Sequence, residues 1–482
     1  MTGCAPWTAL AAALVVTASC AVGPDYHRPK VDVAPDYKET TGWKPSEPND
    51  VLTRGPWWAI YNDETLNQLE GKIDISNENV KAAAAAFDQA RALVAQARAG
   101  FWPTVTGSVS RQYVASGTSG AIITNGAGLP VATNARSHIT NSAGLSGNWD
   151  LDIWGKIRRT TESNRASAQA SAAALAAARL SAQSSLATDY FELRAQDQLQ
   201  KLLDDTVDAE KQSLKITESR YQFGVAARAD VVTAQTQLLS SQAQQINAKI
   251  QRGVLEHAIA VLVGQQPAAF SLDASSVRTD VPTVPAGIPS TLLERRPDVA
   301  EAERRVAAAN AQIGVAIAAY FPDFTLGGSD DYTGVSMSRL IRAPNRVWSF
   351  GPALAQTLID GGLRRAQVDA ARAAYEGTVD SYRQTVLAGF QQVEDELVTL
   401  RVLEQQATVE EAAVAAAREA EKLTLNQYKA GTVPYSSVIT AQTARLSAEQ
   451  TALTVLSNRL QASVALIEAV GGGWDASQLP LP

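Results

Sequence analysis

The chain has 482 residues, only 6% of them aromatic, and alanine recurs along most of its length. This composition favours long, closely packed helices over compact globular domains. The formal net charge of -7 and the pI of about 5.3 argue against nucleic acid as a partner, because phosphate binding needs a basic face. Two cysteines, Cys4 and Cys20, precede the body of the chain and three histidines are scattered along it, which leaves no disulfide framework and no metal-ligand set.

The first twenty residues have the pattern of an export signal. An apolar run at 9–16 is followed by the sequence TASC, which places small residues directly before Cys20. Eight apolar residues are too few to span a bilayer. We therefore predict a signal peptide at 1–19 and a lipidated Cys20 at the start of the mature protein, with no cofactor besides this covalent lipid. The alternative is a buried apolar segment with an incidental cysteine.

Residues 20–62 are predicted to form a lipidated N-terminal tether. It should run extended from 21 to about 55, because a Gly-Pro step and spaced prolines disfavour both helix and central strand. The aromatic residues at 57–61 should then pack the start of the first helices. These helices are predicted over 63–100 with a break near Ser76. Asp63 and Ser76 are the predicted N-caps.

Near residue 103 the apolar periodicity changes from about 3.6 to 2, which predicts β-strands. One hairpin is expected at about 103–153, with an exposed Gly/Ser/Asn-rich loop at 116–137, and a second at about 321–358. Each chain thus offers four strands, whereas the smallest membrane barrels need about eight. Because an open sheet of this length leaves bare edges, either it packs on the helices or several chains pool their strands. Of these two hypotheses, the pooling of strands from several chains makes the more specific prediction.

An internal duplication organises the chain. The sequence YQFG at 221–224 returns as YKAG at 428–431, and VVTAQT after the first turn returns as VITAQT after the second. The separation of about 207 residues is far longer than a solenoid repeat. We predict structural repeats at 63–263 and 290–473, joined by a proline-rich connector at 264–289 and followed by a tail at 474–482.

Each repeat is expected to contain a long helical hairpin. A run without proline from Gly155 to Gly224 corresponds to a helix of roughly 100 Å at about 1.5 Å per residue. Leucines and alanines at steps of three and four indicate that such a rod packs against other helices. The predicted turn residues are Tyr221 and Gly224 in the first repeat and Tyr428 and Gly431 in the second.

Five motifs in a fixed order resemble the TolC-like outer-membrane factor family, in particular its NodT-type efflux lipoproteins. They are VGPDY at 22–26, WDLDIWG at 149–155, RRPDV at 295–299, the two Ala-Gln turns, and GGGW at 471–474. The resemblance covers almost the whole chain. It implies a mainly α-helical protein with a transmembrane β-barrel: a homotrimer that pools four strands per chain into one barrel, continued by a long α-helical tunnel across the periplasm.

The resemblance also implies a function. The protein would be a lipid-anchored exit duct in the outer membrane, docked by a periplasmic adaptor to a proton-driven inner-membrane pump, and small amphipathic compounds would leave through it. The residues agree that it is no enzyme, since no Ser/His/Asp, Cys/His or metal constellation is visible. Two alternatives remain: an exit duct for a secreted polypeptide (type I secretion), and a periplasmic coiled-coil scaffold without a pore.

At the predicted periplasmic tip the sequence departs from the family. Relatives commonly carry an aspartate before the second Ala-Gln and an arginine after it, where this chain has Thr440 and Thr443. Thr440 is predicted to be a residue of the tip together with Arg228, Asp230 and Tyr435. The nearby charges are instead Arg228 and Asp230 in the first half. We predict that these two residues contact a neighbouring helix and that Tyr435 packs across the second turn, so that together they hold the tip closed. The alternative is that Asp230 caps its helix and Arg228 is solvated.

Overall fold

The computed structural model describes residues 21–34, 36–39, 56–115, 122–124, 130–132, 137–282, 284 and 295–480. The predicted signal peptide and Cys20 lie outside these residues. The chain divides into two compact units, each of which draws on both sequence repeats. The sheet unit comprises Met1–Arg28, Gln89–Ala168 and Arg305–Thr378, and the helical unit comprises Pro29–Asp88, Gln169–Arg304 and Val379–Pro482.

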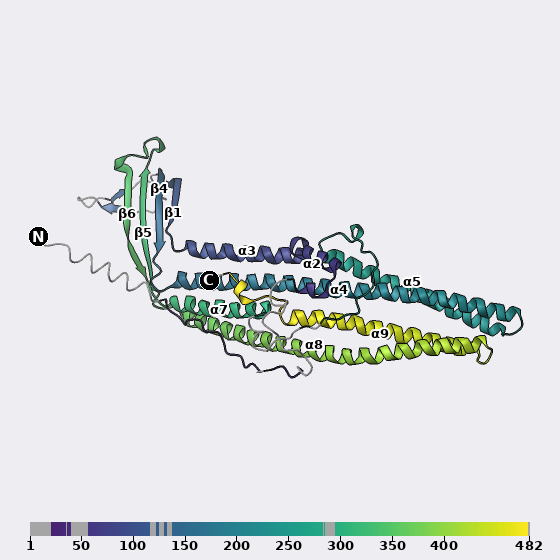
Figure 1. The fold of residues 1–482 in the computed structure, drawn as a ribbon. Helices are drawn as coiled ribbons and strands as arrows, with labels where there is room; N and C mark the ends of the chain where they lie inside the picture. The colour runs from purple at the N-terminus through teal and green to yellow at the C-terminus, as the bar shows by residue number, and fades with distance from the viewer. Residues whose placement is uncertain are drawn as a thin grey trace. The chain divides into compact units, whose positions relative to one another are not determined.

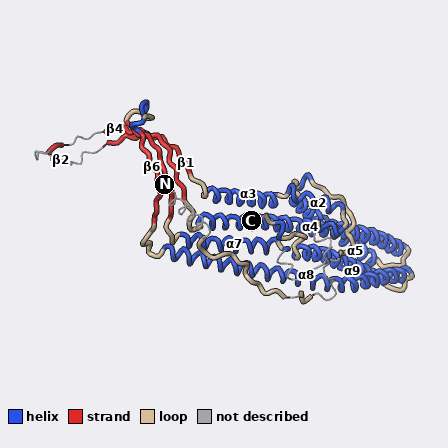
Figure 2. The backbone as a smooth tube through the Cα atoms, turned by 60° about the vertical axis from the view of Figure 1, so that its left-hand side comes forward, coloured by secondary structure: helices blue, strands red, loops and turns tan. Residues whose placement is uncertain are grey.

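The sheet unit contains one antiparallel sheet of four strands in the order β1-β4-β5-β6 (Figures 1 and 2). Its strands are β1 (Thr104–Ala115), β4 (Ser137–Asp150), β5 (Asp323–Gly334) and β6 (Arg346–Ala355). The four predicted strands are thereby confirmed. The two hairpins join through the β4–β5 pairing, in which Leu145 faces Asp330, so a strand from each sequence repeat lies at the centre. Within the predicted loop, β2 (Ile122–Thr124) and β3 (Pro130–Ala132) form a short ladder of their own.

The helices confirm a mainly α-helical fold built from two copies of one pattern. The two outgoing helices each have 67 residues and the two returning helices each have 35, as expected from a duplication. None of the helices among the described residues combines the length and the apolar character needed to cross a membrane. The α-helices are α2 (Glu64–Ser76), α3 (Glu78–Ala99), α4 (Lys156–Gln222), α5 (Arg228–Leu262), α7 (Pro297–Ala318), α8 (Leu363–Lys429) and α9 (Tyr435–Ala469), and the 3-10 turns are η3 (Trp57–Tyr61), η4 (Pro267–Ala269), η5 (Met337–Arg339), η6 (Ala343–Asn345) and η7 (Ala476–Gln478).

The predicted N-cap is correct for α2 and wrong for α3. Asp63 caps α2, because its Oδ1 accepts a hydrogen bond from the Leu66 N–H at 3.1 Å. The cap of α3 is Asn77 rather than Ser76, and its Oδ1 accepts from two backbone N–H groups at 3.0 Å. Ser76 is the last residue of α2, and its hydroxyl donates to the Val263 carbonyl at 2.7 Å.

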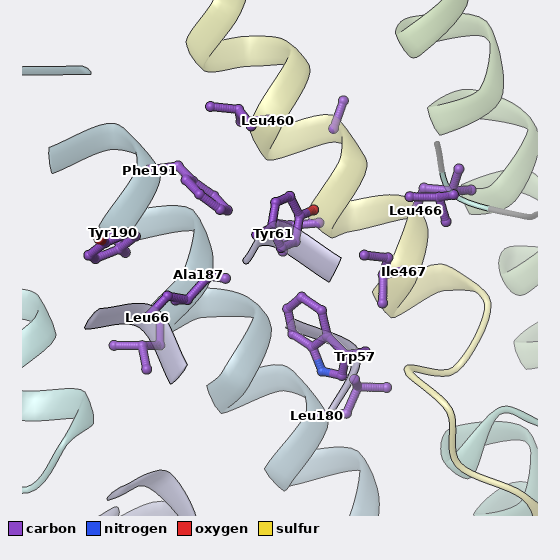
Figure 3. Packing of buried hydrophobic residues seen from close by; sticks show 14 of the residues in the cluster. Trp57, Tyr61, Leu66, Leu180, Ala187, Tyr190, Phe191, Leu460, Leu466 and Ile467 are labelled. Carbon is purple, nitrogen blue, oxygen red and sulfur yellow. The ribbon is translucent and has the colours of Figure 1, made fainter. Parts of the chain in front are cut away.

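The core of the helical unit forms around η3, between α4 and α9 (Figure 3). The Tyr61 ring lies 4.7 Å from that of Phe191, and its hydroxyl is 2.5 Å from the Ser463 Oγ. The aromatic cluster that was expected to pack on α2 therefore also joins the two sequence repeats. Trp57 and Tyr61 are each about 1% exposed, and burying side chains of this size stabilises the fold by about 1.5–3 kcal/mol each.

The RRPDV and GGGW motifs meet in the helical unit. The buried Arg296 guanidinium donates to the Gln392 side chain at 2.8 Å and to the Ala469 carbonyl at 3.0 Å, so it fixes the start of α7 on the end of α9. Gly471 follows α9 with a φ of 98°, and a Cβ there would lie 2.1 Å from the Arg295 carbonyl oxygen. Both motifs are therefore structural. The Arg296 side chain bonds the two chain segments, and the lack of a side chain at Gly471 lets them approach each other.

Candidate functional sites at the helix turns and on the sheet

The two helix turns have the same backbone geometry. Gly224 and Gly431 have φ values of 73° and 78°, a region that favours glycine. The N–H of each donates to the carbonyl of the tyrosine three residues earlier at 2.9 Å. Tyr221, Gly224, Tyr428 and Gly431 thus lie at the two turns.

The environments of the two turns differ. Tyr428 is 3% exposed, and its hydroxyl donates to the Thr217 Oγ1 at 3.3 Å, whereas Tyr221 is 42% exposed. The glutamines of the two Ala-Gln pairs follow the same rule, because Gln442 is buried and donates to the Ser213 Oγ while Gln235 is exposed. The second-half motif is therefore used inside the chain, and the first-half motif is left on its surface.

Arg220 is a tip residue that the sequence reasoning missed. It sits in the last turn of α4, and its Nη1 donates to the Lys429 carbonyl at the end of α8 at 3.0 Å. Its guanidinium also lies over the Tyr428 ring, 4.8 Å from the centroid. A cation at the end of a helix was the available signal, since it offsets the partial negative charge of the last carbonyls. Only the structure shows that Arg220, in the last turn of α4, also bonds the end of α8.

Tyr435 is buried beside the second turn. It is 2% exposed, and its ring lies 5.2 Å from that of Tyr428 in a cluster that also contains Ala234 and Val438. Burial raises the pKa of Tyr435 to about 12, so the phenol stays neutral at every physiological pH. Arg220, Tyr428 and Tyr435, called the tip cluster below, thus tie the second hairpin to the first within one chain.

Arg228 and Asp230 do not contact each other in the part of the chain that the structure describes. The exposed Arg228 guanidinium lies 5.8 Å from the Tyr221 ring centroid. Asp230 is the third residue of α5 rather than its N-cap, and its Oδ2 accepts from the Ala227 N–H at 3.3 Å. The cap position itself is Ala227, which has no side-chain acceptor, so Asp230 supplies the only side-chain hydrogen bond described at this helix start.

Thr440 lies outside the tip cluster. It is exposed, and its hydroxyl donates to the Ser436 carbonyl one turn earlier in α9 at 3.0 Å. This is an ordinary arrangement for a threonine within a helix. Within the described part of the chain, the hydrogen bond of its hydroxyl thus stays inside α9.

The second candidate site is the sheet, which has one apolar and one polar face. The register places Val109, Ala143, Tyr332 and the residues two positions along each strand on the same face. The exposed apolar residues on this face are Val105, Val109, Tyr113, Leu145, Trp348, Phe350 and Leu354.

The opposite face is lined by small hydroxyl side chains. Thr106, Ser146, Ser329 and Ser349 lie in one row across the four strands. The hydroxyls of Ser329 and Ser349 are 3.1 Å apart. Alternation of apolar and polar side chains along a strand is typical of a barrel with a lipid-facing outside and a polar lumen.

The segment directly after Cys20 is fixed on the sheet unit. The Val22 N–H donates to the Trp154 carbonyl at 3.1 Å, and the buried Arg159 side chain donates to the Val22 and Gly23 carbonyls. A Cβ on Gly23 would lie 2.4 Å from the Gly314 Cα, which explains the glycine of the VGPDY motif. Residues 22 and 23 therefore lie at the point where β4 leads into α4.

Comparisons with known proteins agree on one family. A family model described as "Outer membrane efflux protein" matches residues 71–265 and 288–472. The chain is 29% identical over 471 residues to the probable efflux pump outer membrane protein TtgC of Pseudomonas putida, covering 96% of this chain and 95% of that protein. It is 30% identical over 479 residues to Nodulation protein T of Rhizobium leguminosarum bv. viciae, covering 98% and 95%. The structure of the outer-membrane channel OprN matches with a TM-score of 0.86 at 28% identity, over 94% of this chain and 100% of that chain.

Proposed function

The chain belongs to the outer membrane efflux protein family, whose members are channels of efflux pumps rather than enzymes, and we propose that three copies form one channel. Small amphipathic compounds would pass through it without chemical change. A periplasmic adaptor and a proton-driven inner-membrane transporter would deliver them, since the relative TtgC is named as a component of an efflux pump.

The two-faced sheet carries this proposal. Its edge strands are β1 and β6, and in one chain neither has a further partner among the described strands. In lipid an exposed edge is costly because its backbone groups stay unpaired, and in water the free edge and the apolar face favour association with another strand. If β1 of one copy pairs with β6 of the next, three copies supply twelve strands, an even number within the range of bacterial barrels. The apolar faces would then contact lipid, and the serine rows would line the lumen.

The test is to measure the mass and the conductance of the same preparation. The detergent-extracted protein is expected to have the mass of a trimer and, after reconstitution into a planar bilayer, to carry single-channel current. A stable monomer with the full β content by circular dichroism would contradict the pooled barrel. A trimer without current would favour the scaffold alternative.

The lipid anchor is a separate part of the proposal. Cys20 is two residues from Val22, which is hydrogen-bonded at the end of the sheet where the helices attach. A diacylglycerol on Cys20 would therefore enter the leaflet at that end of the barrel, on the periplasmic side. From the sequence pattern we also propose a signal peptide at 1–19, a tether at 20–62, repeats at 63–263 and 290–473, a connector at 264–289 and a tail at 474–482.

Replacing Cys20 by serine is expected to abolish metabolic labelling with a fatty acid while many molecules still reach the outer membrane. The physical reason is that one lipid adds hydrophobic attachment to a protein that its barrel already holds. The control is Cys4→Ser, which should keep the label in full. Label retained by Cys20→Ser would place the lipid elsewhere.

For the tip we propose two surfaces. The first turn exposes Tyr221, Phe223 and Val225, of which Phe223 is 80% exposed, and this apolar end is proposed to meet the adaptor. Arg228 and Asp230 lie beside it without an ion pair in the described part of the chain, so their charges are available to a neighbouring copy. The closed tip would then be held by the tip cluster within each chain and by this charge pair between chains.

Asp230→Asn is expected to raise the mean current through the channel. The amide oxygen can still accept from the Ala227 N–H, while the charge that attracts a neighbouring arginine is lost. An exposed pair is worth about 0.5–1 kcal/mol, which corresponds to an open-to-closed ratio about two to five times higher. The control is Asp208→Asn, which removes an exposed carboxylate on α4 that pairs with Lys211. Equal current in the two variants would leave Asp230 only its role at the helix start.

A further inference from the structure

We propose that the rim of the sheet opposite the helices binds the phosphate groups of the phosphorylated glycolipid in the outer leaflet of the membrane. The rim cluster consists of Arg111, Arg339, Arg342 and Arg346. It lies at the end where β5 leads into β6, while α3, α4, α7 and α8 adjoin the other ends of the strands (Figure 2). The placement of this end on the exterior side rests on the proposed function. The positions and charges of the four arginines do not depend on it.

The segment between β5 and β6 is strongly basic in an acidic protein. Residues 334–346 contain three arginines and no carboxylate, although the whole chain has a net charge of -7. Arg339 and Arg342 are exposed, and neither forms an ion pair with any carboxylate among the described residues. The same is true of Arg111, whose guanidinium lies 5.6 Å from the Tyr113 ring centroid.

The nearest carboxylates do not neutralise this charge. Arg346 binds Asp330 through two parallel hydrogen bonds of 2.7 and 2.9 Å, so that pair has no net charge. Asp331 is the next residue, and alternation along the strand puts it on the polar face. Three uncompensated positive charges therefore remain at the rim, and they need an anionic partner.

The arginines are held by an ordered loop rather than by a flexible one. The Asn345 side chain donates to the Arg339 and Leu340 carbonyls at 2.9 and 3.0 Å, and Leu340 is buried. The Asn141 side chain ties the start of the loop by donating to the Gly334 carbonyl at 3.2 Å. In the sequence Arg339 and Arg342 flank Ile341, which is 75% exposed. Two cations beside an exposed apolar residue match the phosphates and the adjoining hydrocarbon of a lipid.

The position of the rim cluster on the sheet indicates its depth in the membrane. Arg111 and Arg346 share the apolar face with Tyr113 and Trp348. Charged side chains on a lipid-facing strand are costly at the bilayer centre and nearly neutral at the interface, where aromatic residues also gather. The rim cluster therefore lies at headgroup depth. Guanidinium groups bind phosphate in pairs of hydrogen bonds, and a lipid with two phosphates and no amine would meet three unpaired arginines without repulsion.

The test uses the full-length protein in detergent and bis-phosphorylated lipid A as the probe. Immobilised protein is incubated with micelles that contain the lipid and washed, and the retained lipid is quantified by mass spectrometry. Arg339→Gln/Arg342→Gln is expected to weaken retention at least about tenfold, because two charge-assisted contacts are removed. Arg98→Gln/Arg365→Gln removes two exposed arginines from the helices of the same unit and should retain lipid as the unmodified protein does.

Dephosphorylated lipid A should bind at least about tenfold more weakly than the bis-phosphorylated form, since the phosphates carry the charge. Equal retention by the unmodified protein and the Arg339/Arg342 variant would overturn the inference, as would equal binding of the dephosphorylated lipid. Displacement of the lipid by millimolar inorganic phosphate would assign the cluster to a free anion and also overturn it. Bilayer current from the same samples reports the channel separately, so the two proposals fail independently.

Discussion

Replacing Gly471 by alanine is expected to lower the free energy of unfolding of the helical unit by about 3 kcal/mol or more. The φ of 98° at Gly471 is strained for any residue with a Cβ. The added methyl carbon would also start 2.1 Å from the Arg295 carbonyl oxygen, so the start of α7 would have to move away from the end of α9. The measurement is the thermal loss of helical circular dichroism of the purified protein.

Gly253→Ala is the matched control for this prediction. Gly253 lies within α5, and a Cβ there meets no atom within 4 Å. Alanine in a helix interior is better than glycine by about 0.5–1 kcal/mol, so the control should melt at the same temperature or slightly higher. If both variants had the same melting temperature, the contact between the RRPDV and GGGW motifs would not be structural.

Glu70→Gln is expected to remove a loss of stability that the unmodified protein shows as the pH rises. Glu70 is 1% exposed in α2, no described group donates to either carboxylate oxygen, and burial raises its pKa to about 9. Between about pH 4.5 and 9 the folded chain keeps a proton that the unfolded chain releases, so stability falls through that window. The fall should be on the order of 2–4 kcal/mol by pH 8, and the variant should not show it.

The measurement compares melting temperatures at pH 5 and pH 8. Asp189, whose pKa burial raises to about 6, titrates in both proteins and cancels in the difference between them. Glu404→Gln, at an exposed position of α8, is the control and should keep the full pH dependence. Identical pH dependence in Glu70→Gln and the unmodified protein would mean that Glu70 is ionised in the folded chain.

The motifs that hold the fold are distinct from the residues that are proposed to meet partners. Arg296 and Gly471 belong to motifs that carry the resemblance seen in the sequence, yet both serve contacts inside the helical unit. Arg228 and Arg339 belong to no such motif, and both present an unpaired charge at the surface of the described chain. Partners that differ between relatives are expected to be recognised by residues of this second kind.

The sequence by itself determined the elements that depend on short-range physics. The periods of 3.6 and 2 located the long helices and the four strands, because the side chains that face one side recur at these steps. Gly224 and Gly431 marked the two turns, because only glycine takes a positive φ there without strain. Asp63 was recognisable as a cap, since its acceptor lies three residues away in the chain.

The tertiary structure alone decided what joins positions far apart in the chain. Tyr221 and Tyr428 are equivalent in sequence, yet only Tyr428 is buried, because Arg220 and Tyr435 from other helices cover it. Ser76 and Asn77 are equally good caps by type, and Ser76 is instead engaged by a carbonyl 187 residues away. Local sequence cannot rank such contacts, because each depends on which helices pack side by side.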